Sequence, residues 1–151
     1  MKFLQYCIVR GCLKTNNTVH HIKPNVSPLC AYCGLENEWI YHLFVQCNVV
    51  KVFWSNLANL FIDDLIIDIP TDRKSIIFGI HSKPFDSIEN YVILAAKQYI
   101  WTNKFREPHT PLLVNAFINI LKYKIEELKN VYKIRKDNLS YEQWDNVLFL
   151  L

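Results

Sequence analysis

Three of the five cysteines and one histidine gather between residues 30 and 47, in the order Cys-x2-Cys-x8-His-x4-Cys. Two cysteines separated by two residues can turn both sulfurs toward one ion, and Gly34 directly after them permits the positive φ that such turns often use. Three thiolates and an imidazole form a standard tetrahedral set for structural zinc, soft enough to favour zinc over magnesium or calcium. The spacing therefore predicts a Zn²⁺ site whose ligands are Cys30, Cys33, His42 and Cys47. Four protein ligands leave no open position for water, so the predicted role of the ion is structural.

The last two ligands cannot both face one ion from a regular α-helix. Five residues advance about 500° at 3.6 residues per turn, which leaves His42 and Cys47 roughly 140° apart. We therefore expect a short helix from Glu38 to Phe44 and a new helix starting near Asn48. Cys47 would then lie at a helix N-terminus, where the helix dipole favours a thiolate. The alternative is a cluster of free cysteines around a core histidine, because free cysteines are often buried.

Length and composition indicate one folded domain. The chain has 151 residues, of which 51% are hydrophobic, 14% aromatic and 21% charged, and this composition excludes disorder through high charge and low hydrophobicity. No apolar run reaches the roughly 18 residues that a membrane span needs. The N-terminal apolar stretch is too short for a signal peptide, and clustered cysteines favour a reducing compartment. We expect an intracellular protein, in the nucleus or the cytoplasm.

The pattern of apolar residues predicts a mainly α fold, a small helical domain organised by the zinc knuckle. Three glycines in all and few turn dipeptides argue against a sheet. Leu4, Ile8 and Cys12 recur at helical spacing, and residues 15–18 can cap a second short helix. A third, amphipathic helix is expected over residues 48–61. We expect residues 1–61 to form the zinc-binding region and residues 62–151 to form a helical tail packed in the same domain.

Capping signals predict where the helices of the tail begin. Asp72 can cap a segment that ends at Gly79 and that could be a helix or a strand. The remaining signals are a capping box of Asp86 and Glu89 before a central helix, Thr110 with Pro111 at the first position of the longest helix, which extends to Tyr132, and a capping box of Ser140 and Gln143 before a last helix that contains Trp144.

The tail also carries a basic segment. Residues 97–136 contain nine lysines or arginines and three acidic residues, a balance that can attract polyanions, although it equally fits a solvated helix face. Near the knuckle, Tyr32, Trp39 and Tyr41 could stack on single-stranded bases, and Trp39 is the one expected outside the core. RNA is favoured over duplex DNA because no groove-reading helix is evident. The predicted nucleic-acid contacts are Trp39, Lys97, Lys104, Arg106, Lys122, Lys124, Lys129, Lys133, Arg135 and Lys136.

Motifs of known catalytic sites are incomplete. The sequence PLCAYC at residues 28–33 is similar to the cysteine half of a zinc deaminase signature, but the required His-x-Glu is missing, since His20 and His21 precede Ile22 and Lys23. The sequence FIDD at residues 61–64 is similar to a metal-binding aspartate pair, yet it follows an amphipathic helix and fits a solvated helix end. We therefore predict that the chain is not an enzyme.

The stretch CAYCGLENEWIYHLFVQCNVVKVFW, residues 30–54, resembles the zinc-binding region that follows the polymerase domain in LINE-type (non-LTR) retrotransposon reverse transcriptases. In that family a C-x2-C knuckle, an acidic residue, His-Leu-Phe, a cysteine and Phe-Trp follow in this order. The resemblance extends to the lead-in FLQYCIVRGCLKTNN and to ILAAKQYIWTNKF in the tail. It implies that the zinc ligands are the four named above and that Phe53 and Trp54 are structural. The chain departs from the family pattern at Trp39.

Two functions follow from these observations and from the resemblance. The first is a noncatalytic zinc module that binds nucleic acid, with RNA as the favoured partner. The second is a zinc-stabilised protein-interaction or scaffold domain that docks on the polymerase part of the same element or on another protein. Charge reversal at Lys122, Lys124 and Lys129 is expected to abolish activity under the first hypothesis and to spare it under the second. The sequence gives no indication of an oligomeric state.

Overall fold

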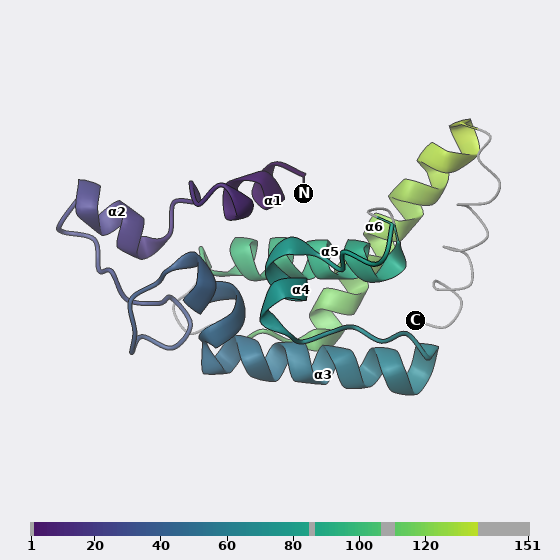
Figure 1. Cartoon of the computed structure of the whole chain (residues 1–151), viewed down its shortest axis with the longest axis horizontal. Helices are drawn as coiled ribbons and strands as arrows, with labels where there is room; N and C mark the ends of the chain where they lie inside the picture. The colour runs from purple at the N-terminus through teal and green to yellow at the C-terminus, as the bar shows by residue number, and fades with distance from the viewer. Residues whose placement is uncertain (1, 85–86, 107–110, 136–151) are drawn as a thin grey trace.

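The computed structural model describes residues 2–84, 87–106 and 111–135, and the regular secondary structure of this part of the chain is helical (Figure 1). The mainly α prediction is confirmed, because the only extended pairing in these ranges is an isolated antiparallel bridge between Leu29 and Asn37. The elements are α1 (Lys2–Val9), α2 (Asn16–Ile22), the π-helical turn η1 (His42–Gln46), α3 (Asn48–Leu65), α4 (Arg73–Phe78), α5 (Ile88–Asn103) and α6 (Val114–Arg135).

Helix α3 supplies one wall of the core. Its apolar residues recur every three or four positions, so one stripe of the helix is buried. The stripe consists of Val50, Phe53, Trp54, Leu57 and Phe61, each at most 2% exposed. The Phe53 ring packs 5.6 Å from the Tyr99 ring of α5 and 5.7 Å from the Phe117 ring of α6, measured between centroids. These three aromatic rings join α3, α5 and α6.

Helix α5 is the central element, as its apolar residues on several faces predict. Ten of its sixteen residues are buried, because α6 crosses one side of it and α1 and α4 cover another (Figure 1). Even Lys97, in the middle of the helix, is only 1% exposed. A helix that is enclosed on several sides needs apolar residues on more than one face.

The N-terminal helices are short. Helix α1 stops at Val9, where Gly11 takes a φ of +68°, so Cys12 lies outside the helix and is exposed. Thr15 caps α2 by accepting a hydrogen bond from the Thr18 N–H, as the sequence predicts.

The starts of α4 and α5 test two of the predictions for the tail. Asp72 caps α4 by accepting bonds from the N–H groups of Lys74 and Ser75, so the segment is a helix and not a strand. The predicted capping box of Asp86 and Glu89 is wrong, because the cap of α5 is Ser87, whose hydroxyl accepts a bond from the Asn90 N–H. Asp86 and Ser87 are both residue types that cap helices well, and the periodicity of the apolar residues does not distinguish adjacent cap positions.

The predicted start of the longest helix is also wrong. Helix α6 begins at Val114 and not at Pro111, because Leu112 turns into the core and the Leu113 carbonyl accepts a bond from the Tyr99 hydroxyl. Helix α3 runs to Leu65, four residues past its predicted end, and crosses the boundary drawn between residues 61 and 62. That division of the chain stays a prediction. Thr110, Ser140, Gln143 and Trp144 lie outside the described residues. No helix in the described ranges combines the length and the apolar character that a bilayer crossing requires.

Candidate metal centre

A π-helical turn solves the geometric problem that the last two ligands pose. The chain is helical from residue 40, and the Cys47 N–H bonds to the His42 carbonyl at 2.9 Å, which makes His42–Gln46 a π-turn. Because this bond spans five residues and not four, the turn is wider, and side chains five apart come toward the same face. Cys47 itself is non-helical and precedes the first residue of α3. The predicted new helix at Asn48 is confirmed. The predicted first helix from Glu38 to Phe44 is wrong in its bounds, because the helical segment runs from residue 40 to residue 46 and widens into the π-turn before it ends at Cys47.

The first two ligands lie on a tight loop closed by backbone bonds. The Gly34 N–H bonds to the Cys30 carbonyl at 2.9 Å, and Gly34 has the predicted positive φ, +63°. The Cys30 N–H bonds to the Glu36 carbonyl at 2.8 Å, next to the bridge between Leu29 and Asn37. A small hairpin-like loop therefore presents Cys30 and Cys33 toward the π-turn.

The four donor atoms form a set that fits one zinc ion. All four lie within 4.8 Å of one another. The Cys30 and Cys47 sulfurs are 3.8 Å apart, and the Cys33 sulfur lies 3.4 Å from His42 Nε2. A tetrahedral ion with zinc–sulfur bonds of about 2.3 Å holds two sulfurs about 3.8 Å apart and a sulfur and a nitrogen about 3.6 Å apart. The donor set and these separations identify a closed Cys3His zinc site.

The second nitrogen of His42 faces an acidic residue. Nδ1 is buried without a well-aligned hydrogen bond, and Glu36 Oε2 lies 3.3 Å from it. A histidine that ligates a metal through one nitrogen commonly donates its other N–H to a carboxylate, which orients the ring. The Glu36 side chain is 71% exposed, so it can rotate into line with Nδ1.

The position of Cys47 favours its thiolate form. The hydrogen bond from the Cys30 thiol, together with the Val49 and Val50 amides, holds the pKa of Cys47 below its ordinary value. These amides open α3, so the expected effect of a helix N-terminus is present. The same bond to Cys47, together with burial, raises the pKa of Cys30. Zinc takes up thiolates, and its charge stabilises all three of them when it is bound.

A buried ion pair connects the loop that carries Cys30, Cys33 and Glu38, here called the metal loop, to the end of α5. Glu38 lies between the ligands Cys33 and His42 in the sequence, and its side chain is fully buried. One of its oxygens pairs with the ammonium of Lys104, which is equally buried. Glu38 also accepts bonds from the backbone N–H groups of Asn16 and Ala31, at 2.9 and 3.1 Å. The carboxylate thus joins α2, the metal loop and α5, and each of its oxygens has a partner.

Two further contacts hold the loop from outside it. The Tyr32 hydroxyl donates to the Ile100 carbonyl of α5 at 2.5 Å, and Trp54 Nε1 donates to the Phe44 carbonyl at 2.9 Å. Tyr32 is 4% exposed, so this aromatic residue belongs to the core and cannot stack on a base. Tyr41 is partly covered, because the Arg73 guanidinium lies 3.9 Å from its ring centroid.

The predicted phosphate contacts do not form one surface. Lys97 and Lys104 are 1% and 8% exposed, and both ammonium groups bond inside the protein. The prediction is wrong for these two residues. Their place in the basic segment suggested a surface, but Lys97 lies on a covered face of α5, and Lys104, directly after α5, is buried in its ion pair with Glu38. Arg106 and Trp39 are exposed.

The lysines of α6 flank its buried face on two sides. Lys122 and Lys124 are two residues apart, which places them about 160° apart around the helix axis. They therefore lie on opposite borders of the buried face. Lys129 lies on the border with Lys122, and all three are partly exposed. The side chains of Lys133 and Arg135 and the whole of Lys136 lie outside the described residues.

The fold and the site together define a helical protein with a closed structural zinc centre. Residues 1–54, which include all four ligands, match a protein-family model described as zinc-binding in reverse transcriptase. Over these residues the chain is similar to the zinc-binding region of reverse transcriptases, which is not the catalytic polymerase domain, and this match supports the resemblance seen in the sequence. No curated protein and no solved structure matches the chain significantly.

Proposed function

We propose that the chain is a noncatalytic module that binds single-stranded nucleic acid, with RNA favoured over DNA, in the nucleus or cytoplasm. The observation that carries the proposal is the exposed aromatic side chain of Trp39 on the metal loop, 54% exposed between two ligand-bearing segments. Bases stack on exposed aromatic rings with little regard to sequence, at about 1–3 kcal/mol per base. The family description supports this reading, since reverse transcription copies an RNA strand.

The ion pair of Glu38 with Lys104 supplies the rest of the proposed surface. It brings the neighbours of these residues to the same region of the molecule, so Phe105 and Arg106 come near the loop that carries Trp39. Phe105 is 66% exposed, and its ring packs edge-on against Trp101 at 5.1 Å. Two exposed rings and a guanidinium provide stacking and phosphate contacts in one place.

The experiment is fluorescence anisotropy of the zinc-loaded protein with a labelled single-stranded RNA, over a salt series. We expect Trp39→Ala and Arg106→Glu each to weaken binding about tenfold, and Arg106→Glu to reduce the salt slope by about 0.7 per lost phosphate contact. Lys122→Glu, on α6, is the matched charge control. The surface proposed at Trp39, Phe105 and Arg106 replaces the contacts on α6 that the sequence predicts, so this variant should change affinity little. Binding that is lost in Lys122→Glu and kept in Trp39→Ala would place the interface on α6. Absence of binding at low salt would refute the proposal.

A second function is favoured by a separate observation on α1. Phe3, Tyr6 and Val9 are 79%, 57% and 50% exposed and recur every three residues, so they form an apolar stripe on one side of the helix. Such a stripe suits a protein partner, and the polymerase part of the same element is the candidate. If folded, zinc-loaded protein ignores RNA but co-elutes with that polymerase, and Tyr6→Ser abolishes co-elution, the scaffold function holds.

A further inference from the structure

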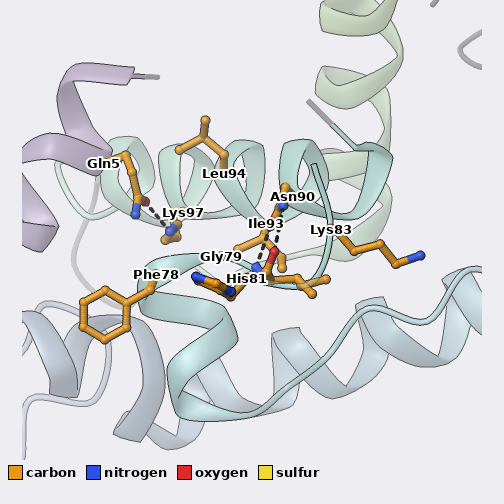
Figure 2. Close-up of a pocket in the computed structure, with 10 residues that line it drawn as sticks. Gln5, Phe78, Gly79, His81, Lys83, Asn90, Ile93, Leu94 and Lys97 are labelled. Carbon is orange, nitrogen blue, oxygen red and sulfur yellow. Dashed lines mark hydrogen bonds between the residues drawn. The ribbon is translucent and has the colours of Figure 1, made fainter. Parts of the chain in front are cut away.

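A pocket of about 210 Å³ opens between α1, the loop that follows α4, and α5, on the side of α5 away from α6 (Figure 2). Helix α1 contributes Gln5, the loop contributes Ile80, and α5 contributes Ile93 and Lys97. The pocket is smaller than the clefts of about 300–1,000 Å³ that hold drug-sized ligands, so its size suits a molecule built around a single ring.

One polar group in the wall of this pocket is a buried cation, the ammonium of Lys97. Lys97 donates hydrogen bonds to the side-chain oxygen of Gln5 and to the Ile77 carbonyl, both of them neutral acceptors. Within the described ranges, no carboxylate pairs with its ammonium. A buried ammonium without a counter-ion is costly, and this burial lowers the pKa of Lys97 to about 7. An anionic ligand would supply the missing charge.

The rest of the lining combines the apolar residues Phe78, Ile80, Ile93 and Leu94 with the polar residues Gln5, His81, Lys83 and Asn90, and specific contacts hold the loop in place. Asn90 accepts a bond from the Ile80 N–H at 2.7 Å and donates to the carbonyls of Ile80 and Pro84, so it fixes the loop over α5. Gly79 has a φ of +89°, and a Cβ there would meet the Asn90 side-chain oxygen at 2.9 Å. The pocket is therefore built by specific contacts that determine the path of the loop. At its margin, Lys83 is already paired with Glu89 at 2.9 Å.

We propose that this pocket binds a small organic carboxylate with an apolar body, whose carboxylate group pairs with Lys97. The apolar body would contact Ile80 and Ile93, and the carboxylate would accept a bond from the Lys97 ammonium while Gln5 keeps its own. This site is independent of the zinc centre and of the proposed nucleic-acid surface, since none of its lining residues takes part in either.

The test is a titration of the zinc-loaded chain with benzoate, followed by calorimetry and by amide chemical shifts. We expect saturable binding of one benzoate, with shifts concentrated at residues 78–83 and 90–97. Benzyl alcohol, which keeps the ring and lacks the charge, should bind at least about tenfold more weakly, because its hydroxyl cannot form the charge-assisted hydrogen bond that a carboxylate forms with the ammonium. That comparison uses the unaltered protein and so does not depend on the folding of a variant.

Two variants complete the test. Lys97→Met keeps an unbranched side chain, one atom shorter, and removes the charge, and it should lower benzoate affinity at least about tenfold. Lys83→Met, at the margin of the pocket, is the matched control and should keep most of the affinity. Equal binding of benzoate and benzyl alcohol, unchanged affinity in a folded Lys97→Met variant, or shifts that spread over the surface as for an adventitious anion would each overturn the proposal.

Discussion

At the scale of single residues, the metal site depends on four side chains that the sequence alone identifies. We expect Cys47→Ala to abolish stoichiometric zinc binding. The variant removes the one ligand whose thiolate form is favoured by the N-terminus of α3, and it leaves only three donors. Structural zinc contributes on the order of 10 kcal/mol to such sites, so the variant should also lose the fold of residues 28–47. Zinc content by atomic absorption and the helical signal in circular dichroism would check this. Cys12→Ala is the control, because Cys12 is exposed and outside the set; equal zinc loss in both variants would refute the assignment.

Lys97 makes a separate prediction about pH. Its folded pKa of about 7 lies below the ordinary value of about 10.4 in the unfolded chain. Between these two pKa values the unfolded chain binds one more proton than the folded chain. The free energy of unfolding therefore rises with pH, by up to about 1.4 kcal/mol per pH unit. Below the folded pKa both states are protonated, so the destabilisation by the buried charge is at its full size and no longer changes with pH. The other titratable groups of this pocket are His81 and Lys83, with Glu89 paired to Lys83.

Urea unfolding at about pH 7, 8 and 9 would measure this effect. In the zinc-loaded protein the free energy of unfolding should increase over this range more steeply than in Lys97→Met, where the titrating group is absent. The variant should also be at least as stable at pH 7, because an apolar side chain replaces a buried, unpaired charge. Parallel pH dependence in the two proteins would contradict the effect of burial on Lys97.

At the scale of the elements, the C-terminus of α3 contains a strained residue. Ile66 has a φ of +55° and is 91% exposed, so a β-branched residue occupies the left-handed position that glycine usually takes. We expect Ile66→Gly to raise the free energy of unfolding by about 0.5–1 kcal/mol, because the left-handed conformation costs about 1–2 kcal/mol per residue and glycine loses part of this gain in chain entropy. Ile62→Gly, in the interior of the same helix, should lower it by about 1 kcal/mol. Thermal unfolding would show shifts of opposite sign, and shifts of the same sign would contradict the strain at Ile66.

The helices also show what a sequence can predict of a fold. The stripe from Val50 to Phe61 and the cap at Asp72 were predictable, because periodicity and capping act over a few residues. The starts of α5 and α6 were not, because Ser87 and Asp86 are equivalent as local signals and the path before α6 depends on a bond between Tyr99 and Leu113. The ligands of the zinc site followed from local spacing in the same way. Its anchoring did not: a buried glutamate at position 38 requires a partner, but nothing local indicates Lys104, 66 residues away.

At the scale of the whole molecule, specific contacts connect the metal loop with residues of the tail. The family match ends at residue 54, yet the metal loop is held by α5 through Lys104 and through the Ile100 carbonyl. A segment that contributes no ligand therefore contributes to the metal site. The basic residues of the tail were first predicted to contact nucleic acid, and Lys104 instead serves this internal role. We therefore expect substitutions in the tail that break these contacts to alter the affinity for zinc.

The ion pair of Glu38 with Lys104 offers the direct test of that coupling. Lys104→Ala leaves a carboxylate buried without its counter-ion, which should cost about 3–5 kcal/mol and weaken zinc binding, because Glu38 positions the backbone of Ala31 between two ligands. The double variant Glu38→Gln with Lys104→Met removes both charges. It keeps only one of the two hydrogen bonds from the Asn16 and Ala31 amides, because these bonds go to different carboxylate oxygens and glutamine has a single side-chain oxygen, so it should recover part of the loss. Competition with a zinc chelator and urea unfolding would measure the two effects. Lys122→Ala, on α6, controls for the loss of a lysine as such. If Lys104→Ala kept its zinc affinity, the metal loop would be independent of the tail, and residues 1–54 should then fold and bind zinc by themselves.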